Sequence, residues 1–337
     1  MRLVATPDNP APREPAVQAV TTADGRTLRA AWWRPRRRGA ALGQGTVVIC
    51  QGRSEHIEKY FETVGDLLRR GFCVLAFDWR GQGLSQRDLP NPDKGHIDDF
   101  ALYDRDIDAI AAHLRQAGLP EPWFGLAHSM GGTVMLRMAH AGTLPFARLV
   151  LSAPLIDLYD LRFPRGARVL AEVLDLVGLG GSFIPGGTAT AFQTQPFADN
   201  VLTSDARRYA RNAAILAADS ALGIGAPTIG WMHAAFRQMR AFADSEFPRR
   251  TLTPTLVIEA GGDRVVDNDA MERFSTRLKA GRLVTIPHCE HEILMEKDVF
   301  RGQFWAAFDA FIPGMRELPA RLRPPNAPTE QREPLAS

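Results

Sequence analysis

Cysteine is scarce in this sequence, and long apolar runs are missing from it. The 337 residues include three cysteines, Cys50, Cys73 and Cys289. These are too few for a disulfide framework, so we expect reduced, mostly buried thiols of a cytosolic protein. No stretch approaches the roughly 18 uninterrupted apolar residues of a membrane-spanning helix. Residues 1–10 lack the apolar region of a secretory signal peptide. These absences argue against a secreted or membrane-spanning protein.

An excess of one charge is also lacking. Forty Lys and Arg residues against 38 Asp and Glu give a net charge of +2, which is too small to indicate a nucleic-acid partner. The one dense basic run, residues 34–38, suits a solvated loop better than a contact with anionic lipid headgroups. We expect a cytoplasmic protein, with peripheral contact at the inner face of the membrane as the alternative.

Apolar and helical segments alternate along most of the chain, which indicates an α/β fold with a mostly parallel, twisted sheet and helices on both faces. Residues 16–22 and 27–33 flank Asp24-Gly25 and are predicted to form a β-hairpin. Further strands are predicted at 46–50, 72–77, 123–129, 148–152, 255–260 and 282–286, and helices at 58–70, 98–116, 271–278 and 300–311, with another directly after residue 129.

The alternation stops between residues 155 and 249, where prolines and glycines separate helical segments and no strand is apparent. We therefore expect a core in two halves, 15–154 and 250–314, with residues 155–249 inserted as a helical cap over the functional site. The proline-rich ends, 1–14 and 315–337, are expected to be disordered.

The most informative motif is Ala-His-Ser-Met-Gly at residues 127–131. It lies between an apolar strand and a helix-forming segment, which is the context of a nucleophile elbow. The turn at such an elbow tolerates only small residues two positions before and after the serine. Ala127 stands where glycine is usual, and Gly131 keeps the second position. Ser129 is therefore the predicted nucleophile.

A serine nucleophile needs a carboxylate that orients its base. Asp263 follows the strand 255–260 after two glycines, which let the chain turn sharply at the end of the strand. Asp267 and Asp269 lie close by in the sequence and are alternatives, but they suit the capping of the following helix. We therefore favour Asp263.

The base is expected after the next strand. His291 follows the strand 282–286, so that it and the acid both lie at carboxyl ends of strands, where open α/β sheets bind ligands. His288 is the alternative, and it also suits a polar loop position. We favour His291.

The oxyanion of an acyl-transfer intermediate needs two N–H donors. Met130, directly after the nucleophile, supplies one predicted donor. Arg53, in the loop after the strand ending at Cys50, supplies the other, and Gly52 allows the backbone to approach closely. Gln51 stands where histidine is common, but the donor is a main-chain group.

With these residues, the chain resembles the lysophospholipase and monoacylglycerol lipase branch of the α/β-hydrolase superfamily. The matching segments are 52–56, 77–85, 95–100, 128–132, 262–268 and 291–298. The segments from Asp263 onward are especially similar to the bacterial lysophospholipases. The resemblance implies an α/β-hydrolase fold and a serine esterase, without cofactor or metal, that cleaves the acyl ester of a monoacyl lipid. It also implies that residues 78–85 have a structural role.

The resemblance is strong in the core and weak in the cap. There, residues 167–180 are amphipathic and largely apolar, which suits packing of the cap on the core, a wall for an acyl chain, or a membrane-touching lid. A general carboxylesterase, an acyltransferase and a non-catalytic binding protein of the same fold are alternative functions. Serine at position 129 disfavours haloalkane and epoxide hydrolases, which carry aspartate there.

Overall fold

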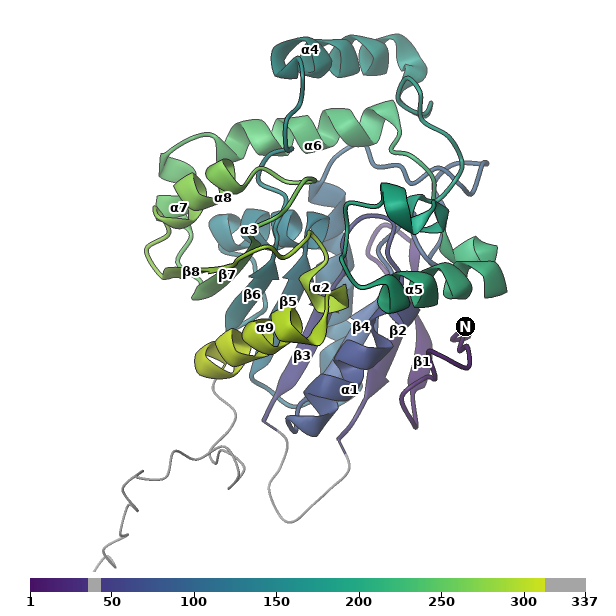
Figure 1. Cartoon of the computed structure of the whole chain (residues 1–337), viewed down its shortest axis with the longest axis vertical. Coiled ribbons are helices and arrows are strands. Elements are labelled where there is room, and N and C mark those ends of the chain that lie inside the picture. The colour runs from purple at the N-terminus through teal and green to yellow at the C-terminus, as the bar shows by residue number, and fades with distance from the viewer. Residues whose placement is uncertain (36–43, 313–337) are drawn as a thin grey trace, which may run out of the picture.

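The computed structural model describes residues 1–35 and 44–312. Its centre is an eight-stranded sheet in the order β1-β2-β4-β3-β5-β6-β7-β8 (Figure 1). The strands are β1 (Ala16–Thr21), β2 (Thr27–Trp33), β3 (Thr46–Cys50), β4 (Cys73–Phe77), β5 (Trp123–His128), β6 (Arg148–Ser152), β7 (Thr255–Ala260) and β8 (Gly281–Ile286). β1 and β2 form the predicted antiparallel hairpin, and β2 also pairs antiparallel with β4. The remaining six strands, β3 to β8, run parallel to one another. The expected mostly parallel sheet is confirmed.

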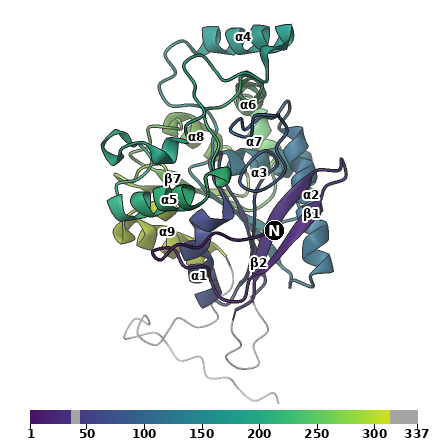
Figure 2. The same ribbon diagram turned by 90° about the vertical axis from the view of Figure 1, so that its right-hand side faces the viewer.

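Helices cover both faces of the sheet. α1 (Phe61–Arg69) and α9 (Asp298–Phe311) lie on one face, and α2 (Ala101–Gln116) and α3 (Met130–Ala141) lie on the other (Figures 1 and 2). α8 (Asn268–Ser275) packs on β7 and β8, and the short helices η1 (Ile57–Tyr60) and η6 (Ile293–Met295) precede α1 and α9. Because both faces are covered, β3, β4, β5 and β7 are buried along their whole length.

The inserted segment is helical in the structure. It contains α4 (Pro164–Leu174), η2 (Asp175–Leu179), η3 (Phe192–Thr194), η4 (Phe197–Asp199), α5 (Ala206–Ala218), η5 (Ser220–Leu222), α6 (Ile229–Phe242) and α7 (Glu246–Arg250). α4 packs against α6 and lies farthest from the sheet (Figures 1 and 2). Ala167 and Ala171 pack against the hydrophobic core cluster, but Val169, Leu170 and Val173 are exposed, so packing on the core accounts for only part of the apolar residues expected at 167–180.

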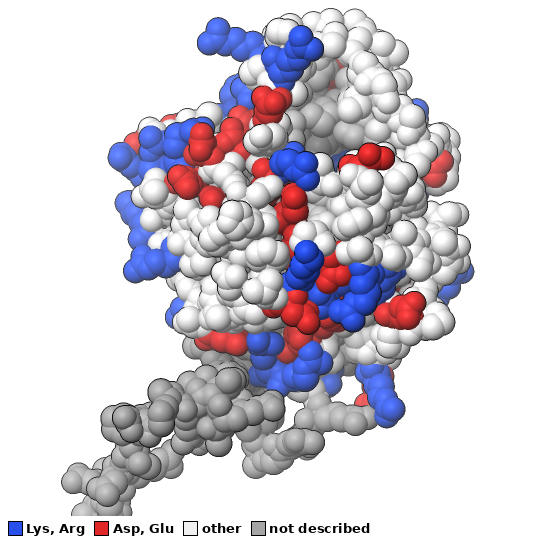
Figure 3. Space-filling model, viewed as in Figure 1, with Lys and Arg blue, Asp and Glu red and all other residues white. Residues whose placement is uncertain are grey.

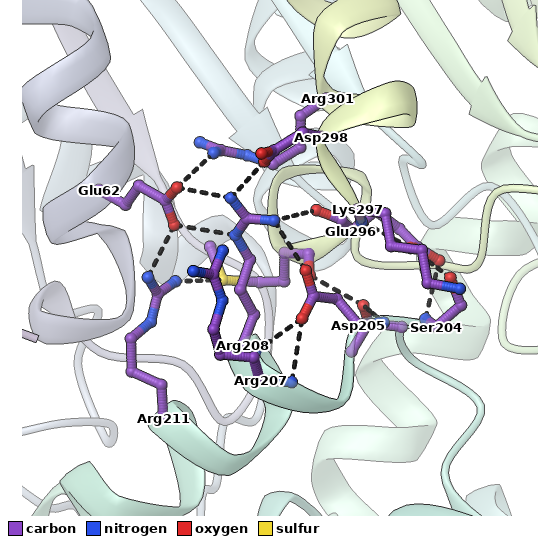
Figure 4. A network of polar contacts seen from close by, with 12 residues as sticks. Glu62, Ser204, Asp205, Arg207, Arg208, Arg211, Glu296, Lys297, Asp298 and Arg301 are labelled. Atoms are coloured by element: carbon purple, nitrogen blue, oxygen red, sulfur yellow. Dashed lines mark hydrogen bonds and ion pairs between the residues drawn. The ribbon is translucent and has the colours of Figure 1, made fainter. Parts of the chain in front are cut away.

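A network of ion pairs fastens α5 to the core (Figure 4). Arg208 of α5 contacts Glu62 of α1 at 2.7 Å and Asp298 of α9 at 2.6 Å, and it donates to the Glu296 carbonyl at 2.8 Å. Arg301 of α9 also contacts Glu62, at 2.6 Å. The network therefore connects the cap to the segment between β8 and α9.

Residues 1–14, which we expected to be disordered, lie against the core in the structure. The Val4 N–H donates to Glu58 Oε1 at 3.0 Å, and the buried Asn9 donates through Nδ2 to the Glu58 carbonyl at 2.9 Å. These contacts give the segment polar partners that its proline-rich composition does not reveal.

Part of the basic run, residues 36–38, and the tail 315–337 lie outside the described residues. Arg34 is described, and its guanidinium donates to the carbonyls of Ala117 and Gly118 at 2.9 and 3.0 Å, just after α2. Across the described ranges, the helices are too short or too polar to cross a bilayer.

Candidate active site

Ser129 occupies a sharp turn between β5 and α3. Its φ of 49° and ψ of −117° are in a region that residues other than glycine rarely adopt, and such strain is common at functional sites. A Cβ at Gly131 would overlap the carbonyls of Cys50 and Gln51, so this position requires glycine. Ala127, in contrast, is buried at the end of β5 without disrupting the strand. The departure from glycine at this position is therefore tolerated.

The structure brings together the serine, the histidine and the aspartate favoured from the sequence. His291 Nε2 lies 3.1 Å from Ser129 Oγ, and His291 Nδ1 lies 2.7 Å from Asp263 Oδ2. The other carboxylate oxygen of Asp263 accepts from the N–H groups of Val265 and Val266, at 2.7 and 3.0 Å. Burial alone would raise the pKa of Asp263, but the charge and hydrogen bond of His291 and the two N–H groups lower it below its ordinary value. The carboxylate is therefore ionised and fixed toward Nδ1.

The competing residues have other positions and contacts. Asp267 is the N-cap of α8 and accepts from the Ala270 N–H at 2.9 Å. Asp269 lies in the first turn of α8, where a negative charge interacts favourably with the helix dipole and stabilises the helix. His288 is exposed in the turn after β8 with a φ of 60°. The geometry thus favours Asp263 and His291 over these alternatives.

Two backbone N–H groups are available at the same edge of the sheet. Met130 begins α3, and Arg53 follows β3 in the loop beside Gly52. In the described ranges, neither N–H donates to a backbone carbonyl. A Cβ at Gly52 would lie 2.9 Å from His128 Nδ1, so glycine is needed for the loop to approach β5. This arrangement suits the binding of a developing oxyanion.

The buried carboxylate of Glu55, a residue that the sequence analysis did not single out, binds the backbone of this loop. Glu55 Oε2 accepts from the Gly52 N–H and from the Tyr60 hydroxyl, the latter at 2.6 Å. Glu55 Oε1 accepts from Lys59 Nζ at 2.7 Å. Burial raises the pKa of Glu55, but the charges of Lys59 and His128 hold it well below its ordinary value. The loop is therefore supported by an ionised carboxylate.

His128 extends these contacts to His291. Its Nδ1 lies 3.0 Å from Glu55 Oε1, and its Nε2 lies 3.3 Å from the His291 carbonyl. Burial lowers the pKa of His128, but the charge and hydrogen bond of Glu55 raise it above the ordinary value. Both ring nitrogens contact oxygen atoms, so His128 connects the loop after β3 to the segment that carries His291. Glu55 and His128 lie in two of the segments that resemble the family, 52–56 and 128–132. This resemblance is the sequence signal that could have pointed to them.

The loop after β3, residues 51–56, also contacts the cap. Ser54 donates through Oγ to the Ile224 carbonyl at 3.0 Å, and Gln193 Nε2 donates to the Ser54 carbonyl at 2.9 Å. The Arg53 guanidinium donates to the Gly225 carbonyl at 2.8 Å. The position of the loop therefore depends on the cap as well as on the core.

The segment 78–85 has structural contacts. Asp78 accepts from the N–H groups of Ile57 and Leu84, at 3.0 and 2.8 Å, and pairs with Arg29 at 2.7 Å. These contacts join β4 to the loop before α1. They are consistent with a role in shaping the core.

Fold and site together define a serine hydrolase of the α/β-hydrolase type. Residues 43–298 match the family described as serine aminopeptidase, S33, and the chain belongs to this family. It is 36% identical over 274 residues to lysophospholipase L2 of Escherichia coli (strain K12), covering 76% of each protein. It is 31% identical over 140 residues to monoglyceride lipase of Rattus norvegicus, covering 41% of this chain and 42% of that protein.

Solved structures share the fold. A soluble variant of monoglyceride lipase from Saccharomyces cerevisiae superposes with a TM-score of 0.69 at 19% identity, covering 90% of this chain and 98% of that one. A carboxyl esterase from Bacillus coagulans gives a TM-score of 0.70 at 17% identity, covering 90% and 99%. The protein is thus an enzyme of the hydrolase class, similar in sequence to lysophospholipases and monoglyceride lipases.

Proposed function

We propose that this enzyme cleaves the acyl ester of a monoacyl lipid, either a lysophospholipid or a monoacylglycerol, through an acyl-enzyme on Ser129. The observation that carries the proposal is the hydrogen-bonded chain from Ser129 through His291 to Asp263, with contacts of 3.1 and 2.7 Å. The names of the relatives, lysophospholipase L2 and monoglyceride lipase, support the substrate class.

Acylation begins with proton transfer. His291 Nε2 takes the proton of Ser129 as Oγ attacks the ester carbonyl, and Asp263 stabilises the imidazolium that forms. The N–H groups of Arg53 and Met130 bind the oxyanion. The tetrahedral intermediate then collapses, the ester C–O bond breaks, and His291 returns its proton to the departing glycerol-type alcohol.

Deacylation repeats these roles with water. His291 takes a proton from a water molecule, whose oxygen attacks the acyl-enzyme carbonyl, and the same two N–H groups bind the second oxyanion. The bond from the acyl carbon to Ser129 Oγ breaks, and His291 returns the proton to Oγ. A free fatty acid leaves, and the resting enzyme is restored.

The substitution Ser129→Ala tests the nucleophile. We expect kcat for a p-nitrophenyl ester to fall by about 10³- to 10⁶-fold, because no covalent intermediate can form. Ser275→Ala removes another buried serine hydroxyl, on α8, and should retain parental activity. A fluorophosphonate should label Ser129 in the folded protein. Parental activity of Ser129→Ala, or absence of labelling, would refute the proposed nucleophile.

We also propose that the outer end of the cap contacts the lipid surface on which the substrate resides. Apolar side chains of α4 and η2 face solvent, with Leu176 86% and Val177 64% exposed. Figure 3 shows uncharged surface over much of this end of the cap, next to basic and acidic side chains. Apolar side chains beside basic ones are typical of helices that lie in a membrane interface.

The double variant Leu176→Gln/Val177→Gln tests this contact by vesicle co-sedimentation. We expect its partition onto vesicles that contain anionic lipid to fall at least tenfold, since burying each side chain contributes about 1.5–3 kcal/mol. Val299→Gln is the control, because Val299 is 65% exposed on α9, on the core. Equal binding of the double variant and the parent would eliminate this face as the contact.

A further inference from the structure

The side chain of Arg53 is partly buried where the core meets the cap, and no carboxylate among the described residues pairs with it. Burial lowers the pKa of Arg53 to about 10, and no carboxylate of the described chain is close enough to offset this. Four arginines of the described ranges are more buried than Arg53, and each of them pairs with a carboxylate; they are Arg29, Arg80, Arg208 and Arg301. An isolated buried cation is costly, so an unpaired one indicates a site for an anion.

The surroundings of Arg53 satisfy only part of its hydrogen-bonding capacity. Its Nη2 donates to the Gly225 carbonyl at 2.8 Å, and its guanidinium carbon lies 5.3 Å from the centre of the Trp231 ring. Its Nε is inaccessible to solvent and has no hydrogen-bond partner among the described residues. A guanidinium offers five N–H donors in a planar fork that matches the oxygens of a phosphate.

The position of Arg53 relates this charge to the reaction. The N–H of the same residue is one of the two proposed oxyanion donors, so its main chain lies at the ester carbonyl. In a lysophospholipid, the glycerol backbone separates the ester from the phosphate. This spacer is comparable in length to an arginine side chain. One residue can therefore contact both ends of the polar part of such a substrate.

We propose that Arg53 binds the phosphate of a lysophospholipid head group, which makes phosphate-bearing monoacyl lipids the preferred substrates over neutral monoacylglycerols. The inference rests on the proposed function, because it assumes that the ester binds at Ser129. The phosphate takes no part in bond making. It replaces the missing counter-anion and orients the ester.

The test compares two substrates with the same acyl chain, 1-palmitoyl-lysophosphatidylcholine and 1-palmitoylglycerol, in the same detergent micelles. The quantity compared is kcat/KM for the lysophospholipid divided by kcat/KM for the monoacylglycerol. We expect Arg53→Met to lower this ratio by about ten- to a hundredfold, the range for a charge-assisted hydrogen bond. Arg53→Lys should retain part of the ratio. A disturbed loop after β3 would slow both substrates and would therefore cancel in the ratio.

The control is Arg237→Met. Arg237 lies on α6, pairs with Asp99 at 3.3 Å, and is half-exposed. This variant should keep the parental ratio. If Arg53→Met also keeps it, the proposal is wrong.

A second experiment uses the parent enzyme and does not depend on the folding of a variant. sn-Glycero-3-phosphocholine should inhibit p-nitrophenyl ester hydrolysis competitively. Its inhibition constant should be at least tenfold lower than that of glycerol or of inorganic phosphate. Equal inhibition by glycerol would contradict recognition of the phosphate. Equal inhibition by inorganic phosphate would assign Arg53 to a free-anion site and would overturn the head-group proposal.

The same data separate this inference from the proposed function. Hydrolysis of both lipids with a ratio that Arg53→Met does not change would refute only the role of Arg53. Failure of the parent to hydrolyse either lipid, together with an unlabelled Ser129, would refute both.

Discussion

At the scale of single residues, the two aspartates after β7 have separable roles. Asp263 contacts His291 at 2.7 Å, whereas Asp267 caps α8 through the Ala270 N–H. Asp263→Asn should lower kcat by about 10³- to 10⁴-fold, because an amide can neither fix the productive tautomer nor stabilise the imidazolium. Asp267→Asn is the matched control and should retain parental activity, since asparagine also caps helices well.

Ester-hydrolysis kinetics of both variants, with far-ultraviolet circular dichroism to verify folding, measure this difference. If the folded Asp263→Asn enzyme remains active and Asp267→Asn loses activity, the acid of the triad has been misassigned.

Ser129, Asp263 and His291 could be predicted because each follows a strand end that is visible in the sequence. The side-chain roles of Glu55 and Arg53 could not. Glu55 also contacts His128, and Arg53 contacts Gly225; these partners lie far along the chain, and only folding brings them together.

At the scale of elements, Glu55 holds together the loop after β3, the end of β5 and η1. Glu55→Gln removes the carboxylate that contacts Lys59 and His128; Lys59 keeps its ion pair with Glu292 at 2.5 Å, whereas the Nδ1 of His128 loses its carboxylate partner. We expect the free energy of unfolding at pH 7 to fall by about 3–5 kcal/mol, the usual cost of breaking a buried ion pair. Urea denaturation measures this loss.

The loss should depend on pH. Glu55 has a pKa below the ordinary 4.5, so its stabilising effect is complete above that pH and disappears as the pH falls through the native-state value. His128 has a pKa above the ordinary 6.5, so the effect of its charge disappears as the pH rises through its native-state value. The difference in unfolding free energy between parent and Glu55→Gln should therefore narrow on both sides of neutrality.

Glu246→Gln provides the control for this measurement. Glu246 pairs with Arg249 at 2.8 Å on the exposed face of α7, and such pairs contribute little to stability. This variant should unfold like the parent at every pH. A difference for Glu55→Gln that stays constant between pH 3 and pH 10 would contradict an ionised Glu55 paired with a protonated His128.

The core elements could be predicted because strands buried on both faces form continuous apolar runs. The cap was harder to predict. Residues 167–180 have helical periodicity, but periodicity does not say what covers an apolar face. In the structure Val169, Leu170 and Val173 are exposed, and packing on the core was the wrong interpretation for them.

At the scale of the whole molecule, parallel strands explain why residues 53, 129, 263 and 291 lie at one edge of the sheet. Each follows the carboxyl end of its strand, β3, β5, β7 or β8, and in a parallel sheet these ends share one edge. This arrangement follows from the strand–helix alternation in the sequence. The packing of residues 1–14 on the core did not, because it depends on contacts with side chains far along the chain, Glu58 and Trp33 among them.

The central claim is that this chain hydrolyses monoacyl lipids through Ser129. The most direct test measures palmitate release from 1-palmitoyl-lysophosphatidylcholine and from 1-palmitoylglycerol by the parent and by Ser129→Ala. The account predicts that the parent releases palmitate from at least one of these lipids and that the variant is slower by about 10³- to 10⁶-fold. A parent that leaves both lipids intact, or a variant that matches the parent, would contradict it.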